Sequence, residues 1–357
     1  MSDKGWQGSI DNLLVNCVGG EPNQHLLIVE EPESEDMYEP GIGSLIAERA
    51  KRMGLTVSAI APDLVKETAD IPMTVSEHMR VADHTLFLSR IGDIARFTPL
   101  SGNGSKTICY ARRVAMFDSY YANSCHKLMS VLLDRLENTL HQAESWQIEC
   151  ALGTNVTGHF NWSEINNTND FTLSFFPVTT FTPVTCDSAS GNVALSRWLM
   201  PGGATKVGPD HVPFQGIVNA AIENGVIQRF EGDPAAVETI QNHYALITNA
   251  LGVNRNRVHS WHAGINPHTF YDSKIEENFE CWNATSFSSP RYLHFHTCGD
   301  LAPCEITWSV FNPTVMIDGE VFWENGNFVW LQRPENRQLI LNAGQSQLLE
   351  PSADIGL

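Results

Sequence analysis

The sequence has no long hydrophobic run and no leader-like start. No apolar stretch approaches the roughly 20 consecutive residues that a membrane-spanning helix needs. The opening residues, MSDKGWQGSIDNLL, lack both the basic segment and the apolar segment of a secretory signal. We therefore expect a cytoplasmic protein without a membrane span.

Basic residues and cysteine pairs are also scarce. The 357 residues include 22 Lys and Arg against 41 Asp and Glu, which gives a formal net charge of −19. A field of this sign repels nucleic-acid phosphates and anionic lipids, so neither is an expected partner. The eight cysteines are widely spread, with no Cys-x-x-Cys motif. We expect most of them to be reduced and buried rather than part of a disulfide framework.

Two common catalytic motifs are missing. No Gly-x-Ser-x-Gly sequence occurs, which excludes the simplest α/β-hydrolase site. The stretch SGNGSKT at 101–107 resembles a phosphate loop, but Ser105 stands where that loop has a glycine before the lysine. A turn that leads into a strand explains this stretch better.

The first 150 residues alternate between strand-like and helix-like patterns. Short apolar runs predict strands at 25–29, 55–60, 85–88 and 106–110. Apolar residues at helical spacing predict helices at 45–53, ending at Gly54, and at 124–143. Strands that alternate with helices favour a parallel sheet, so we predict an α/β fold with a mostly parallel N-terminal βαβ domain at 1–150.

From about residue 151 the sequence becomes rich in β-branched and aromatic residues, with one helical segment at 234–251. We predict a β-rich C-terminal domain at 151–357. Five of the 13 histidines lie between residues 259 and 296, which concentrates ligand chemistry in this half.

These histidines suggest a metal site. If residues 293–296 form a strand, His294 and His296 share one face, because side chains alternate along a strand. His259 or His262 could add an imidazole, and Glu305 could add a carboxylate. Two imidazoles and one carboxylate leave open positions on Fe(II) for a substrate and O2. The same residues could hold zinc or manganese in a hydrolase.

Other interpretations of these histidines and their neighbours remain open. The histidines could be ordinary hydrogen-bonded residues on a polar face. Cys298 and Cys304 are weaker ligand candidates, because their spacing differs from the usual zinc patterns. Trp261 and Trp308 are expected to wall the substrate pocket, although a hydrophobic core would account for them equally well.

The order of motifs resembles the M29 (thermophilic) aminopeptidase family and its relatives, which include 2,5-dihydroxypyridine 5,6-dioxygenase. The resemblance spans most of the chain and implies an M29-like fold. It is carried by GE at 20–21 before the strand at 26–29, ALGTNVT at 151–157, MPGGAT at 200–205, GIV at 216–218, GINP at 264–267, and IDGE with ENG at 317–320 and 324–326.

The chain departs from the peptidase pattern at the metal ligands. The resemblance places the family's first metal-binding Glu at Ala204, its second near His259 or Ser260, and its closing His-x-Asp pair at 305–307, which read Glu-Ile-Thr. A two-metal peptidase site therefore cannot be complete. The remaining set is richer in imidazole, as in the dioxygenase relatives, and this favours one redox metal.

We expect a mononuclear non-heme Fe(II) oxygenase that acts on a small aromatic or peptide-derived substrate. The first alternative is a metal-dependent hydrolase or cyclase acting on an amide or peptide. The second is a metal-free scaffold that binds a peptide or small molecule. The divergence from both family patterns also suggests natural-product biosynthesis, such as tailoring of a ribosomally made, crocagin-type peptide.

We also expect a homodimer. The resembling aminopeptidases form dimers, and several phenylalanines between threonines predict exposed apolar strands that a second subunit would cover. These are Phe171, Phe175, Phe176 and Phe181. If they face the protein's own core instead, no partner is needed.

Overall fold

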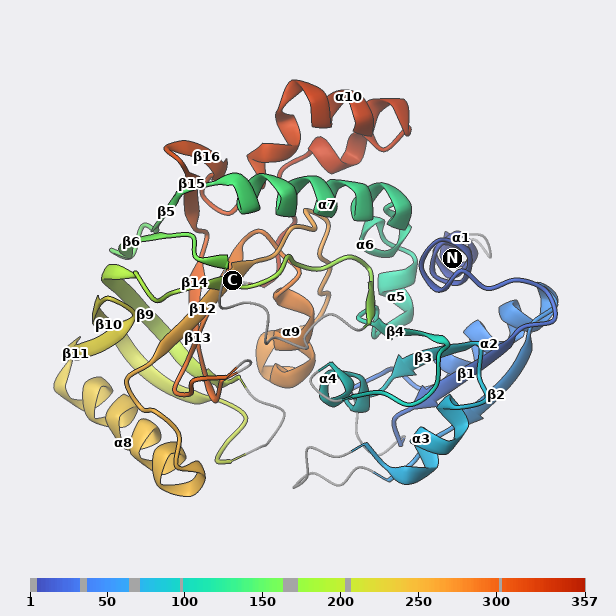
Figure 1. Cartoon of the computed structure of the whole chain (residues 1–357), viewed down its shortest axis with the longest axis horizontal. Coiled ribbons are helices and arrows are strands. Elements are labelled where there is room, and N and C mark those ends of the chain that lie inside the picture. Colours follow the sequence, from blue (N-terminus) through green and yellow to red (C-terminus); the bar gives the residue numbers. More distant parts are fainter. Residues whose placement is uncertain are drawn as a thin grey trace.

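The computed structural model describes residues 5–32, 37–63, 71–96, 99–162, 173–202, 207–301 and 304–356. Two sheets organise this part of the chain, with a five-stranded sheet A on the right of Figure 1 and an eleven-stranded sheet B on the left. The predicted α/β architecture, with a parallel sheet and a β-rich part, is confirmed.

Sheet A is parallel throughout, in the order β2-β1-β3-β4-β7. Its β3 is buried along its whole length, as expected for a parallel strand covered on both faces. The four strands predicted in the first half all form. The strands are β1 (His25–Glu30), β2 (Thr56–Ile60), β3 (His84–Leu88), β4 (Ser105–Cys109) and β7 (Ser174–Phe176).

Helices connect and cover these strands. The α2 helix ends beside Gly54, whose φ of 90° is the left-handed conformation that favours glycine. The predicted amphipathic helix is α7, which runs across the upper part of the molecule in Figure 1, below α10. The helices of this half are α1 (Gly5–Asp11), η1 (Asn12–Val18), α2 (Ile42–Arg52), α3 (Met73–Met79), α4 (Ile91–Ala95), α5 (Val114–Phe117), α6 (Tyr120–Asn123) and α7 (His126–Gln142).

Sheet B is antiparallel. Its main path is β16-β15-β5-β6-β9-β14-β13-β12-β8, and β10 and β11 extend it from β9. The strands are β5 (Ser145–Glu149), β6 (Asn155–His159), β8 (Val184–Thr185), β9 (Ser190–Pro201), β10 (Val212–Glu223), β11 (Val226–Gly232), β12 (Val258–Ala263), β13 (Tyr292–Thr297), β14 (Ile306–Phe311), β15 (Thr314–Ile317) and β16 (Glu320–Trp323).

The second half also carries helices. The predicted helix at 234–251 is α8, which packs against β10 and β11. In α9, Trp282 contacts Tyr292 of sheet B, and Glu280 pairs with Arg90 beside sheet A, so this helix bridges the two sheets. The helices are α8 (Pro234–Leu251), η4 (Ile275–Glu277), α9 (Phe279–Ser286), η5 (Val329–Gln332), α10 (Pro334–Asn342) and η6 (Ser346–Leu349).

The two sheets do not divide the chain cleanly at residue 150. The β5 strand precedes that position and lies in sheet B, whereas β7 follows it and lies in sheet A. The chain therefore passes between the sheets more than once. All eight cysteines are free thiols, and five of them are buried. Among the helices of the described ranges, none combines the length and apolar character of a bilayer-spanning segment.

The expected surface position of the phenylalanines is corrected. Phe175, Phe176 and Phe181 are buried within the protein's own hydrophobic clusters, and Phe171 lies outside the described residues. These three rings therefore need no second subunit to cover them. The homodimer remains a prediction without this support.

Candidate metal centre

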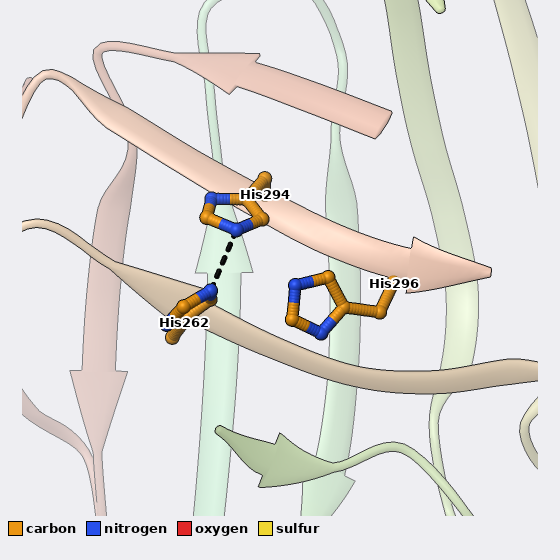
Figure 2. Close-up of side chains that lie close together, drawn as sticks. All are labelled: His262, His294 and His296. Carbon is orange, nitrogen blue, oxygen red and sulfur yellow. Dashed lines mark hydrogen bonds between the residues drawn. The ribbon is translucent and has the colours of Figure 1, made fainter. Parts of the chain in front are cut away.

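Three histidines meet on one face of sheet B. In the antiparallel pair β12–β13, His262 lies opposite His294 and Ser260 lies opposite His296. Opposed residues of antiparallel strands point to the same side of the sheet. Figure 2 shows the three imidazole rings gathered on that side.

The rings are close and buried. The Nε2 atoms of His262 and His294 are 2.6 Å apart, and one potential ligand atom from each of the three residues lies within 4.8 Å of the others. The exposed fractions are 3% for His262, 8% for His294 and 7% for His296. Bulk water therefore has little access to these nitrogens.

Thr180 fixes the tautomer of His262. The Thr180 hydroxyl donates its proton to the carbonyl oxygen of Ala263 at 2.9 Å, so it accepts the hydrogen bond from Nδ1 of His262 at 3.0 Å. The lone pair of His262 then lies on Nε2 and points at His294. Such a second hydrogen bond is the usual means of orienting a metal-binding histidine.

The Ser260 hydroxyl connects the rings of His296 and His259. Its oxygen lies 3.1 Å from Nδ1 of His296 and 2.9 Å from Nδ1 of His259. When His296 donates to Ser260 and Ser260 donates to His259, the Nε2 lone pair of His296 is available as a ligand. In contrast, Nδ1 of His294 is buried and has no hydrogen-bond partner among the described residues.

Burial keeps these imidazoles neutral. It lowers the pKa of His294 to about 3, with a further contribution from the positive charge of Arg96. Burial also lowers the pKa values of His262 and His296 well below the usual range, and the neighbouring imidazoles add to this effect. A histidine must be neutral to bind a metal, so the electrostatics of this group suit a ligand set.

The donor set fits a divalent first-row metal. Imidazole nitrogen suits iron, zinc, copper and nickel, whereas magnesium and calcium prefer oxygen. Two ring nitrogens already face each other, and a third is near enough to join them. In the part of the chain that the structure describes, the group contains no carboxylate.

The other two expected ligands lie outside this group. The His259 ring is not one of the converging rings and is linked to the cluster by the Ser260 hydroxyl. Glu305 precedes β14, and its backbone N–H bonds to the carbonyl oxygens of Thr297 and Cys298, beyond the position of His296 on β13. The structure thus assembles three imidazoles rather than two imidazoles and the Glu305 carboxylate.

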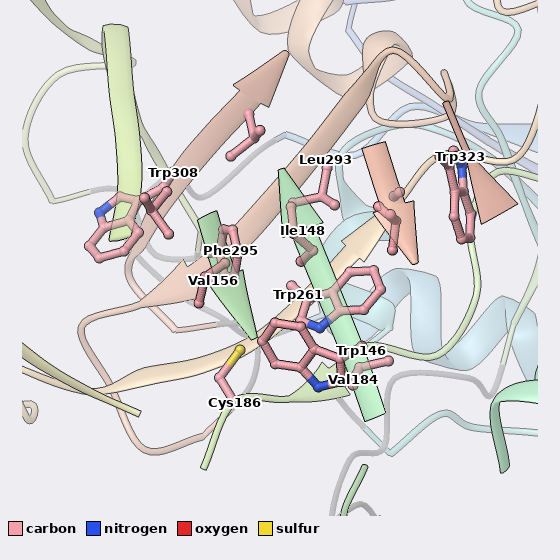
Figure 3. Close-up of a cluster of buried hydrophobic side chains, with 14 of the residues drawn as sticks. Trp146, Ile148, Val156, Val184, Cys186, Trp261, Leu293, Phe295, Trp308 and Trp323 are labelled. Carbon is pink, nitrogen blue, oxygen red and sulfur yellow. The ribbon is translucent and has the colours of Figure 1, made fainter. Parts of the chain in front are cut away.

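The expected position of Trp261 and Trp308 is corrected. Trp261 lies opposite Phe295 on β13, and Phe295 lies opposite Trp308 on β14, so all three point to the face away from His262 and His294. Both tryptophans are fully buried in the hydrophobic cluster of Figure 3. Strand alternation therefore makes them core residues rather than walls of the histidine site.

Residues beside sheet A approach the histidines instead. Arg96, directly after α4, lowers the pKa of all three imidazoles through its charge. Its Nη1 donates to the Tyr110 hydroxyl at 3.3 Å, and the Tyr110 ring contacts Phe287, which contacts His294 in turn. No local sequence signal pointed to Arg96, Thr180 or Ser260, because their role depends on long-range packing.

Comparisons with known proteins agree with the geometry at the level of the fold. No family model matches the chain, and no curated protein matches its sequence. Among solved structures, 2,5-dihydroxypyridine dioxygenase from Pseudomonas putida KT2440 is similar with a TM-score of 0.62 and 14% identity, over 92% of this chain and 98% of that one. AmpT from Thermus thermophilus is similar with a TM-score of 0.53 and 13% identity, over 91% and 99%. The chain therefore has a diverged M29-like fold.

Proposed function

We propose that this protein is a mononuclear non-heme Fe(II) oxygenase, in which His262, His294 and His296 hold the metal. The observation that carries the proposal is the convergence of three buried, neutral imidazoles on one face of sheet B. The likeness of the fold to a solved dioxygenase supports it. The substrate would be a small aromatic or peptide-derived molecule.

In this proposal the metal and the surrounding residues have separate roles. A bound Fe(II) would supply the redox chemistry and the positions at which a substrate and O2 can bind. Thr180 and Ser260 hold two of the rings in the required orientation, and burial excludes water from the nitrogens. Three neutral ligands leave the charge of a divalent ion uncompensated, and Arg96 adds a further positive charge nearby. The site therefore favours a substrate that binds as an anion.

Metal content and oxygen uptake test this proposal. We expect about one iron per chain after anaerobic purification or reconstitution with Fe(II), and a ferrous nitrosyl electron paramagnetic resonance signal after nitric oxide is added. Oxygen electrodes with a panel of hydroxylated aromatic acids would then report turnover. Zinc or manganese at full occupancy with amide hydrolysis would support the hydrolase instead, and a protein that binds no metal would support the scaffold.

The Thr180 hydroxyl gives a finer prediction. Thr180→Val has a similar shape but cannot accept the hydrogen bond from His262, so metal affinity should fall by about 10- to 100-fold. Thr180→Ser keeps the hydroxyl and should retain most of the affinity. Competition with a chromophoric chelator measures both. Equal affinity in the valine variant and the wild type would show that Thr180 does not orient a ligand.

A further inference from the structure

A second polar feature lies beside sheet A and does not include the three histidines. Arg112 follows the end of β4 and is fully buried, with an exposed fraction of 0%. None of its three guanidinium nitrogens has a hydrogen-bond partner among the described residues. Within the described ranges, Arg112 is thus a buried cation whose N–H donors make no hydrogen bond.

The groups around Arg112 do not satisfy it. Asp93 is the acidic partner, but its Oδ2 lies 3.8 Å from Nη2, too far for a hydrogen bond. The Tyr38 and Tyr110 rings lie 5.2 and 5.0 Å from the guanidinium carbon, where they offer cation–π contacts. Their hydroxyls donate elsewhere, to the Cys109 carbonyl oxygen and to Asp93 Oδ1.

Other charges nearby are already engaged. The Glu31 carboxylate follows β1 and pairs with Arg90, which follows β3, at 2.9 Å. Glu31 and Arg112 act on each other electrostatically, but no hydrogen bond joins them. A buried charge without hydrogen bonds is costly, and such a group is usually explained by strain, by function or by a missing ligand.

The position of Arg112 in the fold favours a ligand. Arg112, Arg90 and Glu31 all follow the carboxyl ends of parallel strands, where open α/β sheets bind their ligands. The Asp93 side chain next to the guanidinium is 38% exposed, so the acidic partner of the buried Arg112 reaches the surface. A ligand could reach the guanidinium by displacing that carboxylate.

We propose that Arg112 anchors a binding site for a carboxylate group. The planar guanidinium offers paired N–H donors that match the two oxygens of a carboxylate, and the Tyr38 and Tyr110 rings would flank the bound acid. The site needs no metal and lies beyond the function proposed above. The carboxylate could belong to a free aromatic acid or to the end of a peptide.

The test compares acids with their amides. Thermal shift and isothermal titration calorimetry on the full chain would use benzoate against benzamide, and the peptide Gly-Gly-Phe against its C-terminal amide. We expect the acids to bind and raise the melting temperature, and the amides not to do so. Benzoate binding alone identifies a free acid as the source, and binding of the peptide acid alone identifies a peptide terminus. No effect of either acid on the wild type would overturn the proposal.

Three variants separate a ligand site from a structural arginine. Arg112→Met removes the charge and should abolish acid binding without lowering the urea midpoint, because a buried charge that lacks hydrogen bonds among the described residues is replaced by an apolar chain. Arg112→Lys keeps the charge without the paired donors and should bind at least tenfold more weakly, which preserves the test if the methionine variant does not fold. Asp93→Asn removes the competing carboxylate and should tighten binding.

Two results would contradict the proposal even if the acids bind. One is unchanged acid binding in Arg112→Met or Arg112→Lys, which would place the acid elsewhere. The other is a large stability loss in Arg112→Met together with weaker binding in Asp93→Asn, which would make the Arg112–Asp93 pair structural. Metal content should be unchanged in every variant, so failure of this site is distinguishable from failure of the metal centre.

Discussion

Replacing His294 with alanine is expected to lower the bound iron at least tenfold while the protein stays folded. The substitution removes one of three ligands, and the two remaining imidazoles hold a divalent ion much less tightly. The same loss is expected for His262→Ala and His296→Ala, because all three rings belong to one group. Elemental analysis after reconstitution with Fe(II) measures the effect, and far-ultraviolet circular dichroism confirms the fold.

His259 provides the matched control. It lies on the same strand as His262, but its ring is outside the group of three and is linked to it by Ser260. His259→Ala should therefore keep more than half of the iron, and Glu305→Gln should do the same. Full iron retention in all three cluster variants would refute the assigned ligand set. Iron loss in Glu305→Gln comparable to that in His294→Ala would restore the carboxylate as a ligand.

The architecture was largely predictable because its signals are local. The apolar runs at 25–29, 55–60 and 85–88 match β1, β2 and β3, and the spacing of apolar residues at 124–143 and 234–251 matches α7 and α8. Periodicity is set by the backbone of each element and is therefore visible in a single sequence. The return of residues 174–176 to sheet A depends on tertiary packing, which leaves no such signal.

The candidate site was predictable only in part. Alternation placed His294 and His296 on one face, as β13 has them. The choice between His259 and His262 depends on the β12–β13 register and on the bulge between Val258 and Ser260, and neither follows from residue types. The position of Trp261 and Trp308 could not be predicted in this way, because closeness in sequence to a histidine does not tell which face of the sheet a side chain occupies.

Arg96, Thr180 and Arg112 could not be singled out from the sequence either. Each is an ordinary residue in an unremarkable stretch, and each gains its role from groups far away in the chain. Thr180 meets His262 across 82 positions, and the Arg112 guanidinium lies over the ring of Tyr38. Long-range contacts of this kind can be seen only after folding.

Gly264→Ala is expected to destabilise the protein by about 3 kcal/mol or more, among the larger effects of a single substitution. Gly264 directly follows β12, and a Cβ at this position would lie 2.2 Å from the backbone carbon of Ser288 and 2.3 Å from the carbonyl oxygen of Ser289. Because both neighbours are backbone atoms, no change of rotamer relieves the overlap. The strand end must move, and with it the bridge between Gly264 and Thr180 that supports His262.

Gly8→Ala is the control, since it adds the same methyl group to the α1 helix. The nearest heavy atom to a Cβ there is Asn123 Oδ1 at 3.5 Å, an ordinary contact, and alanine favours a helix over glycine by about 0.5–1 kcal/mol. Urea unfolding should therefore show a large loss for Gly264→Ala and none for Gly8→Ala. Iron affinity should also fall in the first variant and not in the second. A wild-type urea midpoint in Gly264→Ala would mean that Gly264 does not lie against the Ser288–Ser289 backbone. The support of His262 by Thr180 would then be contradicted as well.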